Sequence, residues 1–248
     1  ATAGDDRDAV VTQLFYYTNW FHDYVYSLGF TESARNFQND NFGNGGAGGD
    51  AVEAESDANF TGNQCDSDGS PVKCLNNANF NANGPDGTKP RMQMYVGDTN
   101  PGGVARRTQR ANNRDTVIHE YVHGVSGRII SDGNLAGGIQ SKSLGEGWSD
   151  AIATSINEDP VYGEYNNGDY TTGIRGVAYD DDSLEYGDFS GTSEHNNGRI
   201  WAMNMWETRA ALIAKLGYGP GKALHERLLV EGMKNTVDTP SFHDARTG

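Results

Sequence analysis

Residues 116–127 read TVIHEYVHGVSG, an H-E-x-x-H pattern inside a stretch with the character of a helix. Because four residues make just over one helical turn, His119 and His123 project from one face and can share one zinc ion. Glu120 points about 100° away from His119, where it can hold a metal-bound water without being a ligand. The pattern therefore predicts a helix over residues 115–127 that carries two metal ligands and a general base. The alternative is a pair of interior histidines with no metal.

A zinc ion that does chemistry needs three protein ligands and an open position, so the third ligand must come from another segment. The stretch LGEGWSD, residues 144–150, opens the next helical pattern and places Glu146 and Asp150 four residues apart on one face. Glu146 can complete the site, while Asp150 can accept the other N–H of a zinc-bound histidine and set its tautomer. A third histidine six residues after the second is excluded, because Ile129 stands there. The competing interpretation of Glu146 is an acid favoured by the dipole at a helix N-terminus.

The remaining periodicity predicts a mixed first half and a mainly helical second half, which is an α+β chain. Apolar residues recur at helical spacing from Asp8 to Leu28 and stop at Gly29. Residues 41–89 are rich in Gly, Asn and Asp and predict short irregular strands, and residues 92–96 alternate like a strand. Further helices are expected at Leu144–Asn157, Gly198–Leu216 and Gly221–Met233.

Composition excludes several classes of partner. The chain has 248 residues with 19 Lys and Arg against 34 Asp and Glu, a formal net charge of −15. An acidic surface repels phosphate backbones and anionic lipid, so we expect no nucleic-acid partner and no membrane partner. The acidic run from Asp180 to Asp188 is either a solvated surface or a calcium site, although its spacing matches no defined calcium loop.

Two cysteines, Cys65 and Cys74, lie in the polar, turn-rich stretch NQCDSDGSPVKC. Its Asp-Gly and Ser-Pro pairs let the chain double back, so a local disulfide is predicted, with two free thiols as the alternative. A disulfide favours an oxidising compartment and therefore secretion. The chain begins at Ala1 without a basic and apolar leader, so we expect a processed chain from which a signal segment has been removed.

HEYVHG followed by GEGWSD resembles the fungalysin family of secreted zinc metallopeptidases, which are relatives of the thermolysin group. Four further stretches resemble the same family in the same order along the chain: FHDYVYSLGFTESARNFQNDNFG, NNANFNANGPDGTKPRMQMYV, EHNNGRIWA and PSFHDAR. The resemblance implies a two-lobed, thermolysin-like domain with the active-site helix at the floor of a cleft. A mixed α/β lobe with an edge strand and the H-E-x-x-H helix would span residues 1–135, and a mainly helical lobe residues 136–248.

Matched position by position, the resemblance implies the same three zinc ligands and the same general base. His195 matches the histidine that stabilises the oxyanion of the tetrahedral intermediate, and a surface histidine that caps a helix is the alternative. The family usually has an acidic residue where Arg199 stands, so this neighbour is expected to alter the charge or position of the imidazole. A tyrosine often assists the oxyanion in this group, but residues 128–145 contain none, which leaves that role unassigned.

The resemblance also implies residues that bind the substrate. Asn76, Asn77 and Ala78 resemble the edge strand that pairs with an extended peptide, and Arg175 resembles the arginine that holds a substrate carbonyl. An asparagine-rich turn and a solvated arginine are the respective alternatives.

The function implied is that of a secreted zinc-dependent endopeptidase acting on proteins or peptides, with a preference for an apolar residue after the cleaved bond. Such a protein would be made with an inhibitory propeptide and act as a monomer. The alternative is a non-catalytic zinc-binding remnant of the same fold, because catalytic domains of the family usually extend further at both ends.

Overall fold

The computed structural model describes residues 7–58, 76–97, 108–135 and 137–248. Its main sheet has three strands, β1 (Glu53–Ser56), β2 (Ala78–Asn81) and β3 (Arg91–Met94), in the order β1-β3-β2. β1 runs parallel to β3, whereas β2 runs antiparallel to it with Ala78 opposite Met94, so β2 forms one edge of the sheet. Two shorter strands, β4 (Val96–Gly97) and β5 (Thr108–Gln109), pair antiparallel beside it.

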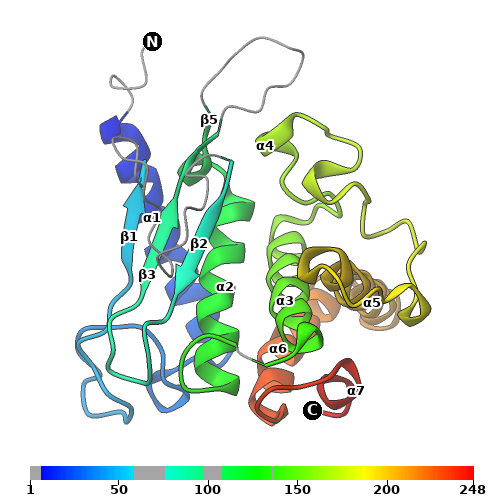
Figure 1. Ribbon diagram of the computed structural model, residues 1–248. Coiled ribbons are helices and arrows are strands. Elements are labelled where there is room, and N and C mark those ends of the chain that lie inside the picture. The colour runs from blue at the N-terminus through cyan, green and yellow to red at the C-terminus, as the bar shows by residue number, and fades with distance from the viewer. Residues whose placement is uncertain (1–6, 59–75, 98–107, 136) are drawn as a thin grey trace.

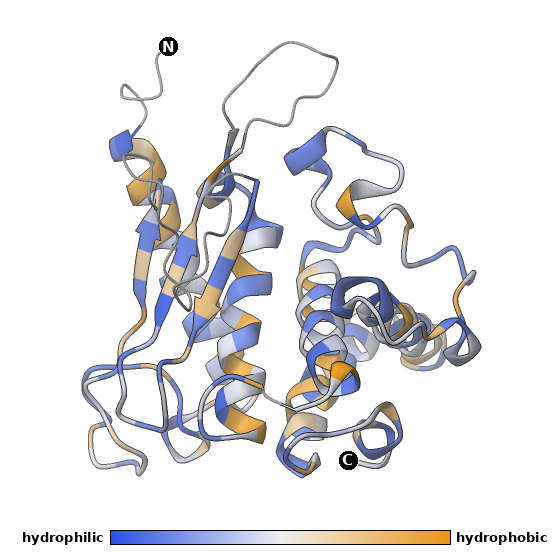
Figure 2. Ribbon diagram, viewed as in Figure 1, coloured by the Kyte–Doolittle hydropathy of each residue, from blue (hydrophilic) through white to orange (hydrophobic). Residues whose placement is uncertain are grey.

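Two helices, α1 (Arg7–Ser27) and α2 (Arg114–Ile130), pack on one face of this sheet (Figure 1). α1 confirms its predicted span and buries a stripe of residues three or four apart, namely Val10, Leu14, Thr18, Phe21 and Val25. α2 is buried along most of its length because the sheet lies on one side of it and further helices on the other. Figure 2 shows hydrophilic residues along α2 as well as hydrophobic ones. Buried polar groups need partners inside the protein, and those partners define the site described below.

The second half of the described chain is mainly helical, with α3 (Ile139–Asn157), α5 (Glu194–Leu216), α6 (Tyr218–Asn235) and α7 (Phe242–Thr247). A long connection between α3 and α5 contains the short helix α4 (Glu164–Asn167) and two 3-10 turns, η3 (Gly173–Arg175) and η4 (Tyr186–Asp188). Two more such turns, η1 (Glu32–Ala34) and η2 (Arg110–Asn112), lie in the first half. α3 packs between α2 and α5 (Figure 1). The predicted α+β class is therefore confirmed.

α3 and α5 approach each other closely because glycines meet at their contact. A Cβ atom on Gly147 would lie 2.6 Å from the Cβ of Trp201 and 2.8 Å from the carbonyl oxygen of Gly198. A Cβ atom on Gly198 would lie 2.7 Å from the Cβ of Glu146. Real carbon atoms stay about 3.5–4.0 Å apart, so only glycine allows this approach. It brings the helix that carries Glu146 against the helix that carries His195.

The end of α2 is anchored by Arg128, whose side chain is completely buried. Its Nη1 donates to the carboxylates of Asp50, at 2.7 Å, and Asp86, at 3.3 Å, and its Nη2 donates to the carbonyl of Thr88, at 3.0 Å. The guanidinium also lies 4.6 Å from the centre of the Phe37 ring. A buried charge must be paired, so these contacts tie the loops before β1 and β3 to the helix of the H-E-x-x-H pattern.

Three predicted helices begin earlier than expected: α3 at Ile139, α5 at Glu194 and α6 at Tyr218. The first turn of α5 is polar and lacks an apolar period, and it is held by the side chain of Ser193, which accepts from the backbone N–H of Asn196. Pro220 stands in the first turn of α6, where its missing N–H is not needed. As a consequence His195 belongs to the first turn of α5 and does not precede the helix.

Candidate metal centre

Three predicted ligands meet between α2 and α3. His119 and His123 leave α2 one turn apart, and their Nε2 atoms lie 3.0 Å from each other. From α3, the two carboxylate oxygens of Glu146 reach the two rings, each 3.4 Å from one Nε2 atom. Within the described residues, this is the single group of three or more His, Cys, Asp or Glu side chains whose donor atoms converge, all within 4.8 Å of one another.

The spacing of these donors suits a zinc ion. Nitrogen and oxygen ligands lie about 2.0–2.1 Å from zinc, so two ligands of a tetrahedral ion are about 3.3–3.4 Å apart. The distances of 3.0 and 3.4 Å between the imidazole nitrogens and the carboxylate match that separation. Two imidazoles and one carboxylate leave one tetrahedral position open, as in catalytic zinc sites. The donor set therefore fits the metal that the sequence predicted.

Asp150 stands behind the first histidine, one turn after Glu146 in α3. Its Oδ1 lies 2.8 Å from Nδ1 of His119, so Nε2 of that ring is left to face the donor cluster. Its side chain is completely buried and also accepts a hydrogen bond from the hydroxyl of Tyr179. Burial acts to raise the pKa of Asp150, but the Arg175 guanidinium and His119 outweigh burial and lower it to about 2. Asp150 is thus a permanent anion that can orient His119.

Glu120 lies beside the cluster and is 6% exposed. Its burial raises the pKa above the ordinary value of 4.5, although the charges of His119 and His123 act in the opposite direction. A carboxylate with a raised pKa next to a metal site can accept a proton and release it again. Its burial and its place next to His119 in α2 are compatible with the predicted general base.

The structure brings His195 to the same place from α5. Its Nε2 atom lies 3.5 Å from Oε2 of Glu146, and its side chain is 55% exposed. Burial of part of the ring lowers its pKa below 6.5, and Arg175 adds to that effect while Glu146 opposes it. An imidazole that is reachable from solvent and close to the donor cluster can donate a hydrogen bond to a reacting group.

Arg175 comes from η3 and is bound more deeply than a solvated arginine would be. Its Nε donates to Asp150, at 2.7 Å, and its Nη2 donates to both Asp150, at 3.0 Å, and Glu146, at 3.1 Å. The guanidinium also lies 4.9 Å from the centre of the Tyr162 ring. Arg175 therefore holds the carboxylates of Asp150 and Glu146 in place by direct hydrogen bonds.

Asn77 and Ala78 stand at the start of the edge strand. The carbonyl of Asn77 accepts from the backbone N–H of Tyr95, and Ala78 pairs with Met94. Both pairings are on the side of β3, which leaves the other edge of β2 without a partner strand among the described residues. β2 packs against α2, through Phe80 and Tyr121 among others (Figure 1).

Two tyrosines of the site, Tyr162 and Tyr179, were not predicted from the sequence. The centre of the Tyr162 ring lies 5.1 Å from the centre of the His119 ring, and the hydroxyl of Tyr179 donates to the carboxylate of Asp150. Burial raises the pKa of both hydroxyls well above 10, so both stay protonated. They come from the irregular connection between α3 and α5, where no period or motif marks them.

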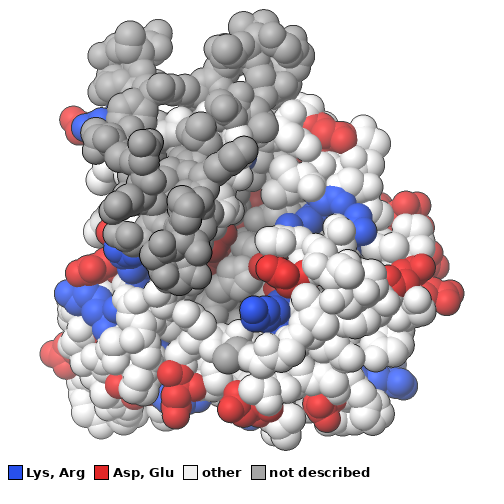
Figure 3. Space-filling model, in the orientation of Figure 1, with Lys and Arg blue, Asp and Glu red and all other residues white. Residues whose placement is uncertain are grey.

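The predicted disulfide and the predicted calcium site are the two remaining candidate sites. Cys65 and Cys74 lie outside the described residues. In the acidic run, the carboxylate of Asp188 accepts from the backbone N–H of Glu185 and so caps η4. No converging group of three ligands forms there among the described residues. Acidic side chains are spread over the visible face of the molecule and do not gather in one patch (Figure 3).

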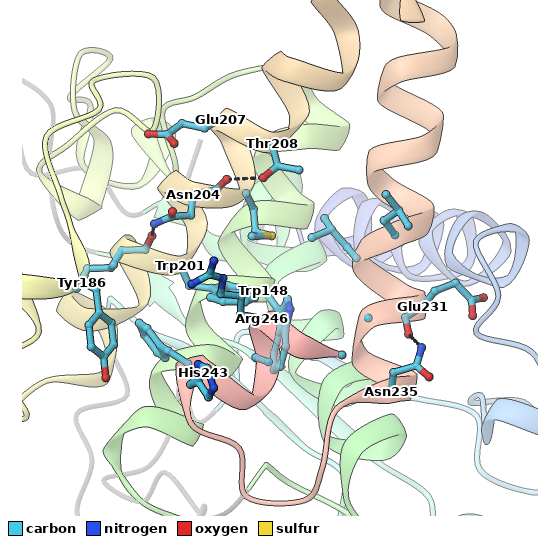
Figure 4. Close-up of a pocket in the computed structure, with 18 residues that line it drawn as sticks. Trp148, Tyr186, Trp201, Asn204, Glu207, Thr208, Glu231, Asn235, His243 and Arg246 are labelled. Carbon is cyan, nitrogen blue, oxygen red and sulfur yellow. Dashed lines mark hydrogen bonds between the residues drawn. The ribbon is translucent and has the colours of Figure 1, made fainter. Parts of the chain in front are cut away.

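A pocket of about 880 Å³ opens between α5, α6 and α7 (Figure 4). Trp148, Trp201 and Phe242 supply much of its apolar wall. Trp148 follows Glu146 by two residues, so the two side chains point about 200° apart on α3. The pocket is therefore separate from the donor cluster.

Comparison with known proteins agrees with this geometry. The family model described as fungalysin metallopeptidase (M36) matches residues 1–248. A protein of Arthroderma gypseum named extracellular metalloproteinase 4 is 37% identical over 270 residues, which cover 97% of this chain and 39% of that protein. A protein of the same name from Trichophyton soudanense is 36% identical over 272 residues, which cover 97% of this chain and 64% of that protein. The chain thus spans less than two thirds of the length of these relatives.

Proposed function

Because this chain belongs to the fungalysin family of metallopeptidases, we propose that it is a zinc-dependent endopeptidase that hydrolyses peptide bonds of proteins. The observation that carries the proposal is the convergence of His119, His123 and Glu146, with Glu120 beside them. These three side chains would hold the ion, and Asp150 would orient His119. Zinc, when bound, supplies Lewis acidity that makes water a better nucleophile and a peptide carbonyl a better electrophile.

Glu120 is the general base in this proposal. It would take a proton from the attacking water and return it to the leaving amine, so one carboxylate serves both steps. Its buried position next to the ligands supports the role, since a base must reach the reacting water and be shielded from bulk solvent.

His195 would donate a hydrogen bond to the oxyanion of the tetrahedral intermediate. Its exposed imidazole beside Glu146 supports this assignment, because the carbonyl under attack must lie next to the ligands.

The substrate would lie extended between two lobes, residues 1–135 and residues 136–248. The unpaired edge of β2, with Asn77 and Ala78 at its start, can add a peptide strand through backbone hydrogen bonds. Arg175, held by the two carboxylates of α3, would hold a substrate carbonyl from the helical lobe. An apolar residue after the cleaved bond is the expected preference.

The same family membership supports a secreted protein, since the two relatives are named extracellular. Among the described residues no helix is both long and apolar enough to cross a membrane. We further propose that Cys65 and Cys74 form a disulfide, that the precursor carries a propeptide, and that the enzyme acts as a monomer.

Chelation together with a single substitution tests the proposal. The purified chain should cleave denatured casein, lose that activity when zinc is removed, and regain it when zinc is added back. E120Q should keep one zinc ion per chain and lose about 10²–10⁴-fold in kcat, the usual contribution of a general base. E53Q, a matched change of an exposed glutamate in β1, should leave activity unchanged.

Two results would contradict the proposal in different ways. Full activity of zinc-loaded E120Q would refute the mechanism. A parent chain that binds one zinc ion and cleaves nothing between pH 5 and pH 9 would favour a non-catalytic zinc protein of the same fold.

A further inference from the structure

Arg199 in α5 is a cation that none of the roles above uses. It stands four residues after His195, so the two side chains lie on one face of the helix. Its Nη1 donates to the main-chain carbonyl of Arg175, at 2.8 Å, and its Nε donates to the carbonyl of Asn196, at 3.2 Å. Among the residues that the structure describes, no carboxylate forms an ion pair with Arg199. Its donors are therefore directed to backbone carbonyls on two different elements.

The turn that Arg199 reaches is η3, which carries Arg175 at its last position. The backbone of Tyr162 also holds η3, because its carbonyl accepts from the N–H of Ile174 at 3.0 Å. Gly173 makes that contact possible, since its φ is +60° and a Cβ atom there would lie 2.1 Å from the Tyr162 carbonyl oxygen. The side chain of Asn167 also donates to the Gly173 carbonyl, at 3.0 Å, and Arg199 supplies the attachment to α5.

The direction of the Arg175 side chain depends on these attachments of η3. Its guanidinium makes three hydrogen bonds to Asp150 and Glu146, and such bidentate contacts require a defined position of the backbone. The segments on either side of η3, residues 168–172 and 176–185, form no helix or strand. A hydrogen bond from a charged donor is among the stronger contacts that can hold such a segment.

We propose that Arg199 is a positioning residue that clamps η3 onto α5, so that Arg175 and His195 face the metal ligands at a fixed separation. It acts through Arg175 and does not contact the substrate. The part of this inference that concerns hydrolysis rests on the proposed function, whereas the clamp itself does not.

Two substitutions with a matched control test the clamp. R199M removes the donors and keeps a long apolar side chain that suits a helix, whereas R199K restores one cationic donor. K215M makes the same type of change at an exposed position in the last turn of the same helix. All three variants should bind one zinc ion and keep the melting temperature of the parent chain within a few degrees.

The first readout needs no activity. The backbone N–H groups of Ile174 and Val177 donate to the carbonyls of Tyr162 and Thr172, respectively. Amide hydrogen exchange at these two positions should be about tenfold faster in R199M than in the parent chain. R199K should recover part of the protection, and K215M should match the parent. Equal exchange in R199M and the parent chain would overturn the clamp even in a preparation that cleaves no peptide.

The second readout is peptide hydrolysis. R199M should lose about tenfold in kcat/KM, the equivalent of one charged hydrogen bond, with most of the change in KM because Arg175 would bind the substrate before and during reaction. In an R175K background the same substitution should add little, because it acts through Arg175. Full additivity of the two effects would refute action through Arg175. An inactive parent chain would instead refute the proposed function and leave the exchange result to decide the clamp.

Discussion

Replacing Gly198 by alanine should disturb the site by forcing α3 and α5 apart, without changing the identity of any of its ligands or of His195. Gly198 lies in α5, three residues after His195, and faces α3. The added Cβ atom would lie 2.7 Å from the Cβ of Glu146, 2.9 Å from the carbonyl oxygen of Ser143 and 3.0 Å from the backbone nitrogen of Gly147. All three atoms belong to a buried helix and cannot rotate away, so α3 and α5 must separate.

The size of the effect follows from these distances. Carbon atoms in contact stay about 3.5–4.0 Å apart, so the helices must part by about 1 Å. Overpacking of this kind costs about 1–3 kcal/mol, while alanine gains about 1 kcal/mol over glycine within a helix, which leaves about 0–2 kcal/mol of destabilisation. Activity should suffer more than stability. Nε2 of His195 is 3.5 Å from Glu146, and a displacement of about 1 Å can cost up to about 10²-fold in rate.

The assay compares G198A with G232A by urea unfolding, zinc content and casein cleavage. Gly232 is also inside a helix, α6, but a Cβ atom there would meet nothing within 4 Å. G232A should gain about 0.5–1 kcal/mol and keep full activity. G198A should bind zinc, stay folded and lose about 10–10²-fold in kcat/KM. If G198A kept the activity of the parent chain, the close approach of α3 and α5 would not be what positions His195.

Three further substitutions test other parts of the structure. R128M should lower the free energy of unfolding in urea by about 3–5 kcal/mol, because it leaves the buried carboxylate of Asp50 without its cation. R227M, at an exposed position of α6, should change that free energy by less than about 0.5 kcal/mol. Burial lowers the pKa of His225 from 6.5 to about 4, so the folded state binds fewer protons than the unfolded state between those values. The stability that depends on the neutral ring is therefore complete above pH 6.5, and about 3 kcal/mol of it is lost as the pH falls toward 4. In H225Q, the free energy of unfolding measured with urea should fall less steeply over that pH range. D150N should weaken zinc binding by about 10–10²-fold in competition with a chelator, because it removes the anion that orients His119, and unchanged affinity would argue against that role.

Local chemistry in the sequence was sufficient to predict the central part of the site. His119, Glu120 and His123 follow from the geometry of a single helix, because residues four apart in a helix share a face whatever surrounds it. The same rule placed Glu146 and Asp150 together one helix later, and the requirement of zinc for a third ligand linked the two helices. α1 and the α+β class were also predictable, since their apolar periods are strong.

Only the tertiary structure decided what surrounds those ligands. The attachment of Arg175 to two carboxylates, and the positions of Tyr162 and Tyr179, depend on an irregular connection that has no period to interpret. The early start of α5 depends on the cap at Ser193, which moved His195 into the helix. Local periodicity is written in the spacing of neighbouring residues, whereas these contacts join residues far apart along the chain. They form only when α2, α3 and α5 have packed together, so the sequence around each of them does not reveal its partner.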